Sequence, residues 1–163
     1  MVSLADANTP LSERIIKEIH SLVLINDRLN RGVYRGVPVR ILGASHTPPL
    51  PYLVPIQMER LLADYDTLKQ SKHSIEAIAE FHLKLEGIHP FVDGNGRTGR
   101  LILNLELMKA GLQPVNIKFA DRRKYYESFD AYYGADHSPE ALIELIANYE
   151  IAELEKRIEI LKS

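Results

Sequence analysis

The segment from Thr98 to Ala110 (TGRLILNLELMKA) limits most strongly what this chain can fold into. Its run LILNLELM is apolar on nearly every side of a helix, and such a helix is stable only when other elements surround it. Gly111 follows at the position where a left-handed glycine commonly ends a helix. We therefore expect a buried central helix with the rest of the chain packed around it.

Five further segments have the apolar spacing of amphipathic helices. The first opens at Thr9-Pro10, a pair typical of a helix start, and ends near residues 30–32. Its apolar stripe comprises Leu11, Ile15, Ile19, Leu22 and Val23. The other four are expected over about residues 55–70, over 74–86 with Ser74 as the cap, from Asp121 to Gly134, and from Ser138 almost to Ser163.

Residues 33–42 (VYRGVPVRIL) alternate instead with a period of two, with Val37, Val39 and Ile41 on one face. Gly36 suits a turn, and Pro38 suits an edge strand. This pattern favours a small exposed β-hairpin, and an irregular connector is the alternative. The predicted fold class is all-α with one small β-hairpin, in a single domain spanning residues 1–163, a length that can bury its own core.

Composition excludes several classes of function. The net charge of −2 and the pI of about 6.3 give no basic field for nucleic acid. The absence of cysteine excludes disulfides, a thiolate nucleophile and a cysteine zinc site. The N-terminal residues lack a signal-peptide pattern and no apolar run is long enough to span a membrane. We expect a cytoplasmic protein without membrane or nucleic-acid partners.

The segment from His89 to Arg100 (HPFVDGNGRTGR) carries the residues suited to chemistry. Gly94 and Gly96 allow successive N–H groups to converge on an anion at the start of the following helix. The cationic residues in its first turn, Arg97 and Arg100, oppose the helix dipole unless a polyanion binds there. Asp93 offers an oxygen ligand to a metal that bridges phosphates, and His89 suits proton transfer near neutral pH.

The same residues satisfy a second pattern. Positions 94–99 (GNGRTG) match the GxGxxG sequence of dinucleotide-binding folds, with residues 115–119 as a possible following strand. That fold needs a buried strand directly before the first glycine. Here a predicted helix comes first and Pro90 interrupts the only candidate strand, so this alternative is disfavoured.

The segment HPFVDGNGRTGR resembles the signature of Fic-domain enzymes, His-x-Phe-x-Asp/Glu-Gly-Asn-Gly-Arg-x-x-Arg, at every specified position. The likeness continues in IKEIH, VRILGASHTPP, RLILNLELMKAGLQPV and DRRKYYESF, and covers most of residues 15–150. It implies a protein adenylyltransferase that moves AMP from ATP to a Ser, Thr or Tyr hydroxyl of a target protein and releases pyrophosphate, with Mg²⁺ as cofactor. Self-modification is also expected.

The resemblance also implies roles for individual residues. His89 would be the general base and Asp93 the ligand of Mg²⁺, while Arg97 and Arg100 would reach the β- and γ-phosphates. The hairpin would be a flap that clamps the target by strand addition. The remaining residues expected to bind the nucleotide are Leu42, Gly43, Ala44, Ser45, Gly94, Asn95, Gly96, Thr98, Gly99, Tyr125 and Tyr126.

Two departures from the family pattern affect these expectations. Tyr133 stands where relatives often carry a small polar residue near the adenine. The inhibitory sequence Ser/Thr-x-x-x-Glu-Gly/Asn has no match, which suggests an unrestrained catalytic core cut from a longer protein. Two other functions remain open: a Fic-fold enzyme that removes AMP or transfers another phosphate-containing group, and a module that binds nucleotide without turnover.

Overall fold

The structure is a computed structural model that describes residues 9–134 and 137–162. Helices dominate these ranges, and they contain no β-strand. The α-helices are α1 (Glu13–Val23), α2 (Val54–Ser71), α3 (Ser74–Ile88), α4 (Asn95–Lys109), α5 (Arg122–Tyr133) and α6 (Glu140–Lys162), with short 3₁₀ turns at Pro51–Leu53 and Phe119–Asp121.

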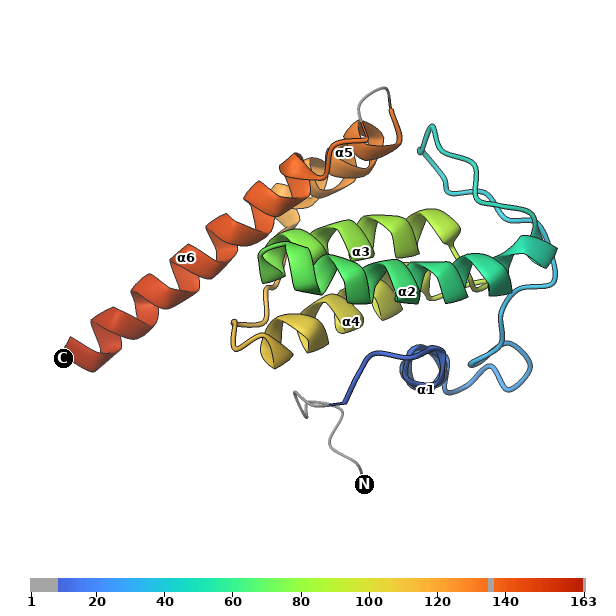
Figure 1. Ribbon diagram of the computed structural model, residues 1–163, viewed down its shortest axis with the longest axis horizontal. Helices are drawn as coiled ribbons and strands as arrows, with labels where there is room; N and C mark the ends of the chain where they lie inside the picture. The colour runs from blue at the N-terminus through green and yellow to red at the C-terminus, as the bar shows by residue number, and fades with distance from the viewer. Residues whose placement is uncertain (1–8, 135–136, 163) are drawn as a thin grey trace.

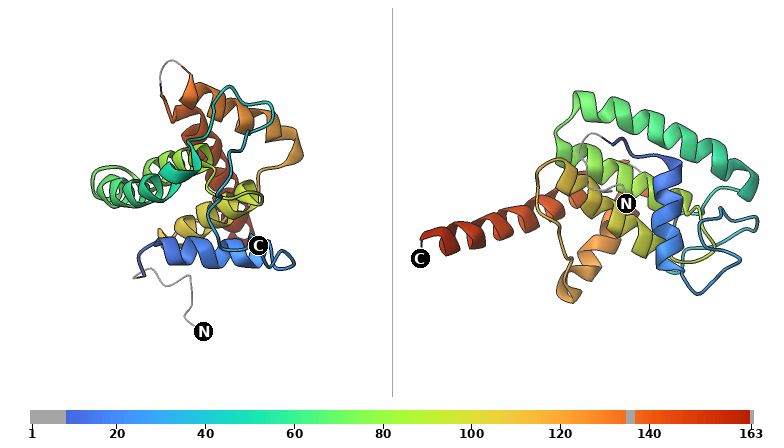
Figure 2. Two further views of the ribbon diagram at one scale, coloured as in Figure 1. Left: turned by 90° about the vertical axis from the view of Figure 1, so that its right-hand side faces the viewer. Right: turned by 90° about the horizontal axis from the view of Figure 1, so that it is seen from below.

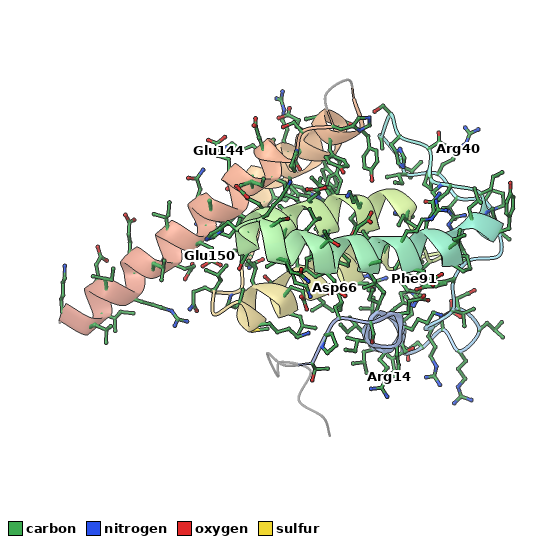
Figure 3. The ribbon with its side chains drawn as sticks, in the orientation of Figure 1. Arg14, Arg40, Asp66, Phe91, Glu144 and Glu150 are labelled. Atoms are coloured by element: carbon green, nitrogen blue, oxygen red, sulfur yellow. The ribbon has the colours of Figure 1, made fainter. Side chains whose placement is uncertain are left out.

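Helices α2, α3 and α4 lie side by side and form the centre of the molecule (Figure 1). Helix α1 crosses them, so it is seen end-on in Figure 1 and lengthwise in the right-hand view of Figure 2. Helices α5 and α6 pack against each other on the far side of α3. The last turns of α6 extend beyond the body, and their side chains stand clear of other helices in Figure 3.

The expected buried helix is present as α4. Ile102, Leu103 and Leu107 are at most 2% exposed, whereas Leu101 and Met108 on its outer side are about half exposed. The amphipathic helix predicted over residues 74–86 is confirmed as α3, and its apolar stripe, Ile75, Ile78, Ala79, His82 and Leu85, is buried. Gly111, with φ of 77°, follows the α4 C-cap as predicted.

The prediction of a hairpin over residues 33–42 is wrong. This part of the chain, with residues 43–46, is an irregular connector, which we call the flap segment (33–46). Its backbone bonds do not pair two strands: Arg35 N–H donates to the Pro90 carbonyl, Val33 N–H to that of Asn30, and Ala44 N–H to that of Ile41 in a local turn. The alternation of apolar residues was therefore misleading, since Val33 and Val37 are more than half exposed.

Several predicted helix ends are also corrected. Helix α1 is capped by the Ser12 hydroxyl instead of Thr9, and it ends at Val23 because residues 24–32 form turns, leaving Leu22 exposed. Helix α3 is capped by His73 in a reciprocal arrangement with Glu76, and not by Ser74. Asp121 occupies the N-cap position of α5 without a side-chain capping bond, because its carboxylate accepts from the Tyr149 hydroxyl instead.

Candidate active site

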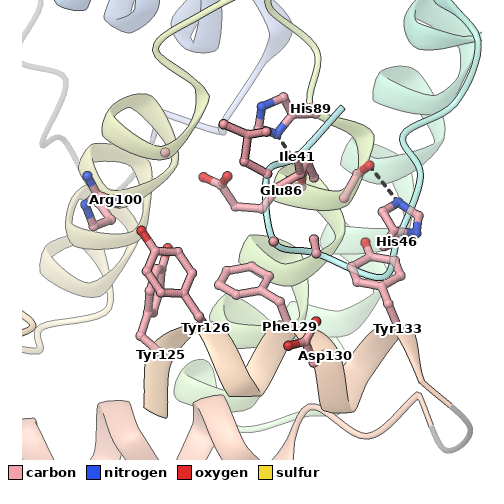
Figure 4. A pocket seen from close by; sticks show the side chains of 15 residues that line it. Ile41, His46, Glu86, His89, Arg100, Tyr125, Tyr126, Phe129, Asp130 and Tyr133 are labelled. Atoms are coloured by element: carbon pink, nitrogen blue, oxygen red, sulfur yellow. Dashed lines mark hydrogen bonds between the residues drawn. The ribbon is translucent and has the colours of Figure 1, made fainter. Parts of the chain in front are cut away.

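A cavity of about 430 Å³ lies where α3, α4, α5 and the flap segment meet (Figure 4). Glu86, Gly87 and His89 line it from the end of α3, and Gly96 and Arg100 from the first turns of α4. The flap contributes residues 41–44 and His46, and α5 contributes Tyr125, Tyr126, Phe129, Asp130 and Tyr133. The positively polarised N-terminus of a helix therefore faces a largely apolar pocket.

His89 ends α3 in the left-handed conformation, with φ of 50° and ψ of 61°. Its Nδ1 lies 3.2 Å from the Glu86 carbonyl oxygen. Because a carbonyl only accepts, Nδ1 carries the proton and Nε2 keeps its lone pair. Burial lowers the pKa of His89, and the nearby charges of Arg35 and His46 add to this effect. His89 is thus a neutral imidazole with Nε2 available to accept a proton.

The turn between α3 and α4 is fixed from inside. The Asn95 side chain accepts from the Phe91 N–H at 2.9 Å and donates to the Phe91 carbonyl at 2.8 Å. Phe91 stacks on His20 of α1, with ring centroids 3.6 Å apart. Gly94 adopts φ of 77° against Val23, His20 and Leu24, so a side chain here would be both strained and crowded. The Asn95 amide therefore braces the loop and is not free to face a ligand.

Asp93 lies outside this cavity, with its side chain 74% exposed. One carboxylate oxygen accepts from Gly94 N–H at 2.6 Å, and the other lies 3.4 Å from the Arg97 guanidinium. Its carbonyl oxygen is 2.9 Å from His20 Nε2, whose other ring nitrogen accepts from Gly32 N–H. The backbone of Asp93 is thereby anchored to α1 while its carboxylate reaches solvent.

The oxygen ligands around Asp93 would suit Mg²⁺ only if substrate phosphates supplied further ligands. No group of three or more His, Cys, Asp or Glu residues within 9–134 and 137–162 is placed to hold a metal. Mg²⁺ commonly takes one or two carboxylates, keeps several waters and completes its shell with substrate phosphates. A single exposed carboxylate beside a helix N-terminus fits that pattern.

Arg97 and Arg100 diverge from the first turns of α4. Arg100 lines the main cavity and also a neighbouring one of about 390 Å³, whereas Arg97 lines only the second. Glu86 faces this region from α3, and burial raises its pKa to about 7, against the opposing charge of Arg100. A methyl group at Gly99 would overlap Glu86 Oε1, so the glycine makes room for this buried carboxyl.

Residues 10–107 match the model of the Fic/DOC family. The chain belongs to the Fic/DOC family. It is 45% identical over 115 residues to a protein adenylyltransferase Fic of Nematostella vectensis, covering 69% of this chain and 26% of that protein. The fold of a Fic-domain signaling protein of Bacteroides thetaiotaomicron superposes with a TM-score of 0.82 at 26% identity, over 93% of this chain and 63% of that one. Fic-1 of C. elegans gives 0.81 at 31% identity, over 94% and 44%.

The chain spans about a quarter of the length of the curated Fic relatives that it matches. The family match excludes the dinucleotide-binding alternative, and so does the fold: helix α3, and not a strand, leads into the loop at Gly94. No helix in the described part of this Fic domain is long and apolar enough to cross a membrane.

Tyr133, which departs from the family pattern in sequence, is part of the α5 wall of this Fic domain's cavity. Its hydroxyl donates to the Leu83 carbonyl at 2.9 Å, and its ring stacks on His46 at 3.8 Å. His46 Nε2 in turn donates to the Gly87 carbonyl. Tyr133 therefore closes one end of the cavity with an aromatic face. Tyr125 is buried, with its hydroxyl 2.8 Å from His82 Nε2, and Tyr126 is half exposed.

The cavity brings together eight of the residues predicted from the sequence: His89, Leu42, Gly43, Ala44, Gly96, Arg100, Tyr125 and Tyr126. Seven others lie beside it or behind it: Ser45, Asp93, Gly94, Asn95, Arg97, Thr98 and Gly99. The residues that sequence reasoning missed are Ile41, His46, Glu86, Gly87, Phe129 and Asp130. Glu86 was detectable, since it is the last residue of the helix predicted over 74–86 and precedes His89 by only three positions.

Proposed function

We propose that this chain is the catalytic core of a protein adenylyltransferase, which moves AMP from ATP onto a Ser, Thr or Tyr hydroxyl of a protein. The observation that carries the proposal is the placement of His89 and the N-terminal turn of α4 around one cavity. Curated relatives named protein adenylyltransferase Fic, 38–45% identical to this chain, support the same activity.

His89 is proposed as the general base. The target oxygen attacks the α-phosphorus, His89 Nε2 takes the hydroxyl proton, and the bond to the leaving pyrophosphate breaks. The lowered pKa keeps the imidazole unprotonated at neutral pH, as a base requires. The Nδ1–H bond to the Glu86 carbonyl fixes both the tautomer and the orientation of the ring.

The first turn of α4 is proposed to hold the phosphates. The N–H groups at the start of a helix lack intrahelical partners and attract anions. We place the triphosphate at Gly94, Asn95 and Gly96, with Thr98 and Gly99 in the turn behind. Arg97 and Arg100 then reach the terminal phosphates from two sides. Asp93 is the proposed ligand of Mg²⁺, which would neutralise phosphate charge when bound.

The aromatic wall of α5 is proposed to receive the base, with Tyr126 and Phe129 beside it and Tyr133 closing the end. Leu42, Gly43, Ala44 and Ser45 of the flap segment would cover the nucleotide. A target segment would pair with the exposed backbone of the flap, which has no strand partner within the described residues. The cytoplasm is the proposed compartment.

The experiment that tests this function uses ATP labelled on either the α- or the γ-phosphate, with Mg²⁺, the wild-type protein and His89→Ala. Modification of the protein itself and of a cell lysate is read in parallel. Label from the α-position only, reduced by about 10²–10⁴ in His89→Ala, is the expected result.

The other results correspond to the alternatives. Label from the γ-position identifies a phosphotransferase on the same fold. Binding of ATP without transfer identifies a nucleotide-binding module, for which the intact His89 has no evident use. Release of AMP from a modified protein would indicate the reverse activity. Any of these three results contradicts the proposal.

A further inference from the structure

Arg35 is a buried charge without an acidic partner. Its exposure is 3%, and no ion pair within residues 9–134 and 137–162 includes it. Buried charges are normally paired with an opposite charge because their desolvation is costly. The guanidinium donates instead to backbone carbonyl oxygens. The desolvation cost of this charge is high for a contact with no role beyond structure.

The carbonyls that Arg35 binds belong to two parts of the molecule. On one side Nε donates to the His89 carbonyl at 2.7 Å and Nη2 to that of Ile88 at 3.3 Å. On the other side Nη1 donates to Val37 at 3.1 Å and Nη2 to Pro49 at 2.6 Å. Val37 and Pro49 lie within and just beyond the flap segment. One planar guanidinium thus joins the flap to the backbone of His89.

His89 has a backbone conformation that needs such support. Its φ of 50° is left-handed, which costs a residue with a side chain about 1–2 kcal/mol and persists only where the surroundings enforce it. The His89 N–H is bonded to the Leu85 carbonyl, and the Arg35 N–H to the Pro90 carbonyl. With Arg35 on the His89 carbonyl, the peptide groups on both sides of the imidazole are fixed.

Arg35 also acts on the imidazole through its charge. Burial is the main cause of the lowered pKa of His89; the bond to the Glu86 carbonyl opposes it, and the charges of Arg35 and His46 lower the pKa further. The other titratable or charged side chains around the same cavity are Glu86 on α3, Arg100 on α4, and Tyr125, Tyr126, Asp130 and Tyr133 on α5.

We propose that Arg35 is a positioning residue for His89: its guanidinium, bonded to the His89 and Ile88 carbonyls on one side and to Val37 and Pro49 on the other, fixes the left-handed backbone that aims the imidazole. Because the same guanidinium binds the Val37 and Pro49 carbonyls, it also ties the backbone of the base to the chain on either side of residues 38–48. The inference rests on the proposed role of His89 as general base, but its geometry can be measured without any turnover.

The test compares Arg35→Lys and Arg35→Met, with Arg40→Met as the control. Arg40 is an exposed arginine of the same flap segment, so its variant removes an equal charge from the surface. NMR on the intact chain reads two properties of His89, assigned by comparison with His89→Ala. The imidazole titration reports the pKa, and the ¹³Cα chemical shift reports the backbone conformation.

Arg35→Met is expected to shift the His89 ¹³Cα resonance and to raise the pKa of His89. Arg35→Lys keeps the charge but one ammonium does not reach carbonyls on both sides, so the ¹³Cα resonance shifts while the pKa stays low. In both variants kcat for AMP transfer is expected to fall by about 10–100-fold with a much smaller change in KM for ATP. Arg40→Met is expected to match the wild type.

An unchanged His89 ¹³Cα shift in Arg35→Lys overturns the proposal, and so does an Arg40→Met variant that behaves like Arg35→Met. If Arg35→Met does not fold, Arg35→Lys and the control still decide the positioning role. If the wild type transfers no AMP, the proposed function fails, yet the two NMR readouts still show whether Arg35 holds His89.

Discussion

The loop from His89 to Arg100 and the flap segment face each other across the cavity, and they are built in opposite ways. The loop is braced by the Asn95 amide, by the His20 ring under Asp93 and by Arg35 on the His89 carbonyl. The flap presents Leu42 at 97% exposure and Val37 at 52%, with no strand pairing in the described chain.

This difference has a physical reason. Catalysis by charge stabilisation depends on groups that are already in place, so a loop that handles phosphates gains from internal bonds. A segment that accepts varied protein targets gains instead from exposed backbone and from apolar side chains that can still pack against a partner. Arg35 connects the two regions, because it bonds to the His89 carbonyl of the loop and to the Val37 carbonyl of the flap. If rigidity is confined to the loop, substitutions in the loop should lower the free energy of unfolding, whereas substitutions in the flap should leave it nearly unchanged.

The largest effect is expected for Asn95→Ala. The substitution leaves the Phe91 N–H and carbonyl without their partner in a buried turn, at about 1–3 kcal/mol for each group. The free energy of unfolding should fall by about 2–6 kcal/mol in urea denaturation followed by circular dichroism. Asn116→Ala, on an exposed residue, is the control and should stay within about 0.5 kcal/mol of the wild type. Equal losses in both variants would mean that the loop is not braced by Asn95.

The second effect concerns Glu86, a buried carboxyl beside the loop that should make the stability of the protein depend on pH. Burial raises its pKa from 4.5 to about 7 in the folded state. The folded protein therefore binds a proton more tightly than the unfolded chain, and stability falls as pH rises from about 5 to about 8. Glu86→Gln does not titrate, so its stability advantage over the wild type should grow by on the order of 3 kcal/mol across that window.

Urea denaturation at several pH values measures this difference. Glu144→Gln, an exposed carboxyl on α6, serves as the control and should run parallel to the wild type. A Glu86→Gln variant that also runs parallel to the wild type would show that the carboxyl is ionised at little cost, with Arg100 as an effective partner.

The third prediction compares a glycine of the loop with one of the flap. A methyl group at Gly99 would overlap the Glu86 carboxyl, whereas one at Gly36 would meet no atom within 4 Å. Gly99→Ala should therefore cost about 1–3 kcal/mol through overpacking, and Gly36→Ala should cost little. In a double-mutant cycle, Glu86→Ala should relieve part of the Gly99→Ala penalty. Additive losses would rule out the contact.

The sequence predicted the helical part of this architecture well because helix signals are local. The apolar run of α4, the stripe on α3 and the glycine after α4 are each readable from spacing alone. The flap was mispredicted for the same reason. Alternation of apolar residues also arises when a connector is pinned by distant groups, and the partners of Arg35 at Ile88, His89 and Pro49 are invisible in a local pattern.

The residues of the candidate site likewise fall into two groups, those that a local motif identifies and those that only tertiary packing brings together. A signature motif identified His89 and Arg100, which do line the cavity. The motif did not predict that the Asn95 side chain faces inward and bonds to Phe91. It also did not predict that Asp93 lies outside the cavity beside Arg97. His46 and Glu86 join the site through tertiary packing. His46 does so by bonding to the Gly87 carbonyl on α3, a contact across 41 positions of sequence that no short motif encodes.

The smallest effect on stability is expected at the flap. Leu42 is 97% exposed, so Leu42→Ala removes almost no buried area and should change the free energy of unfolding by less than about 0.5 kcal/mol. If the flap receives the target, the same variant should raise KM for the target protein severalfold while kcat at saturation holds, since binding is lost and the base is untouched. The measurement is the rate of AMP transfer against target concentration, with thermal unfolding in parallel. A clear loss of stability, or a fall in kcat alone, would contradict the docking role and would mean that the flap is held as rigidly as the loop it faces.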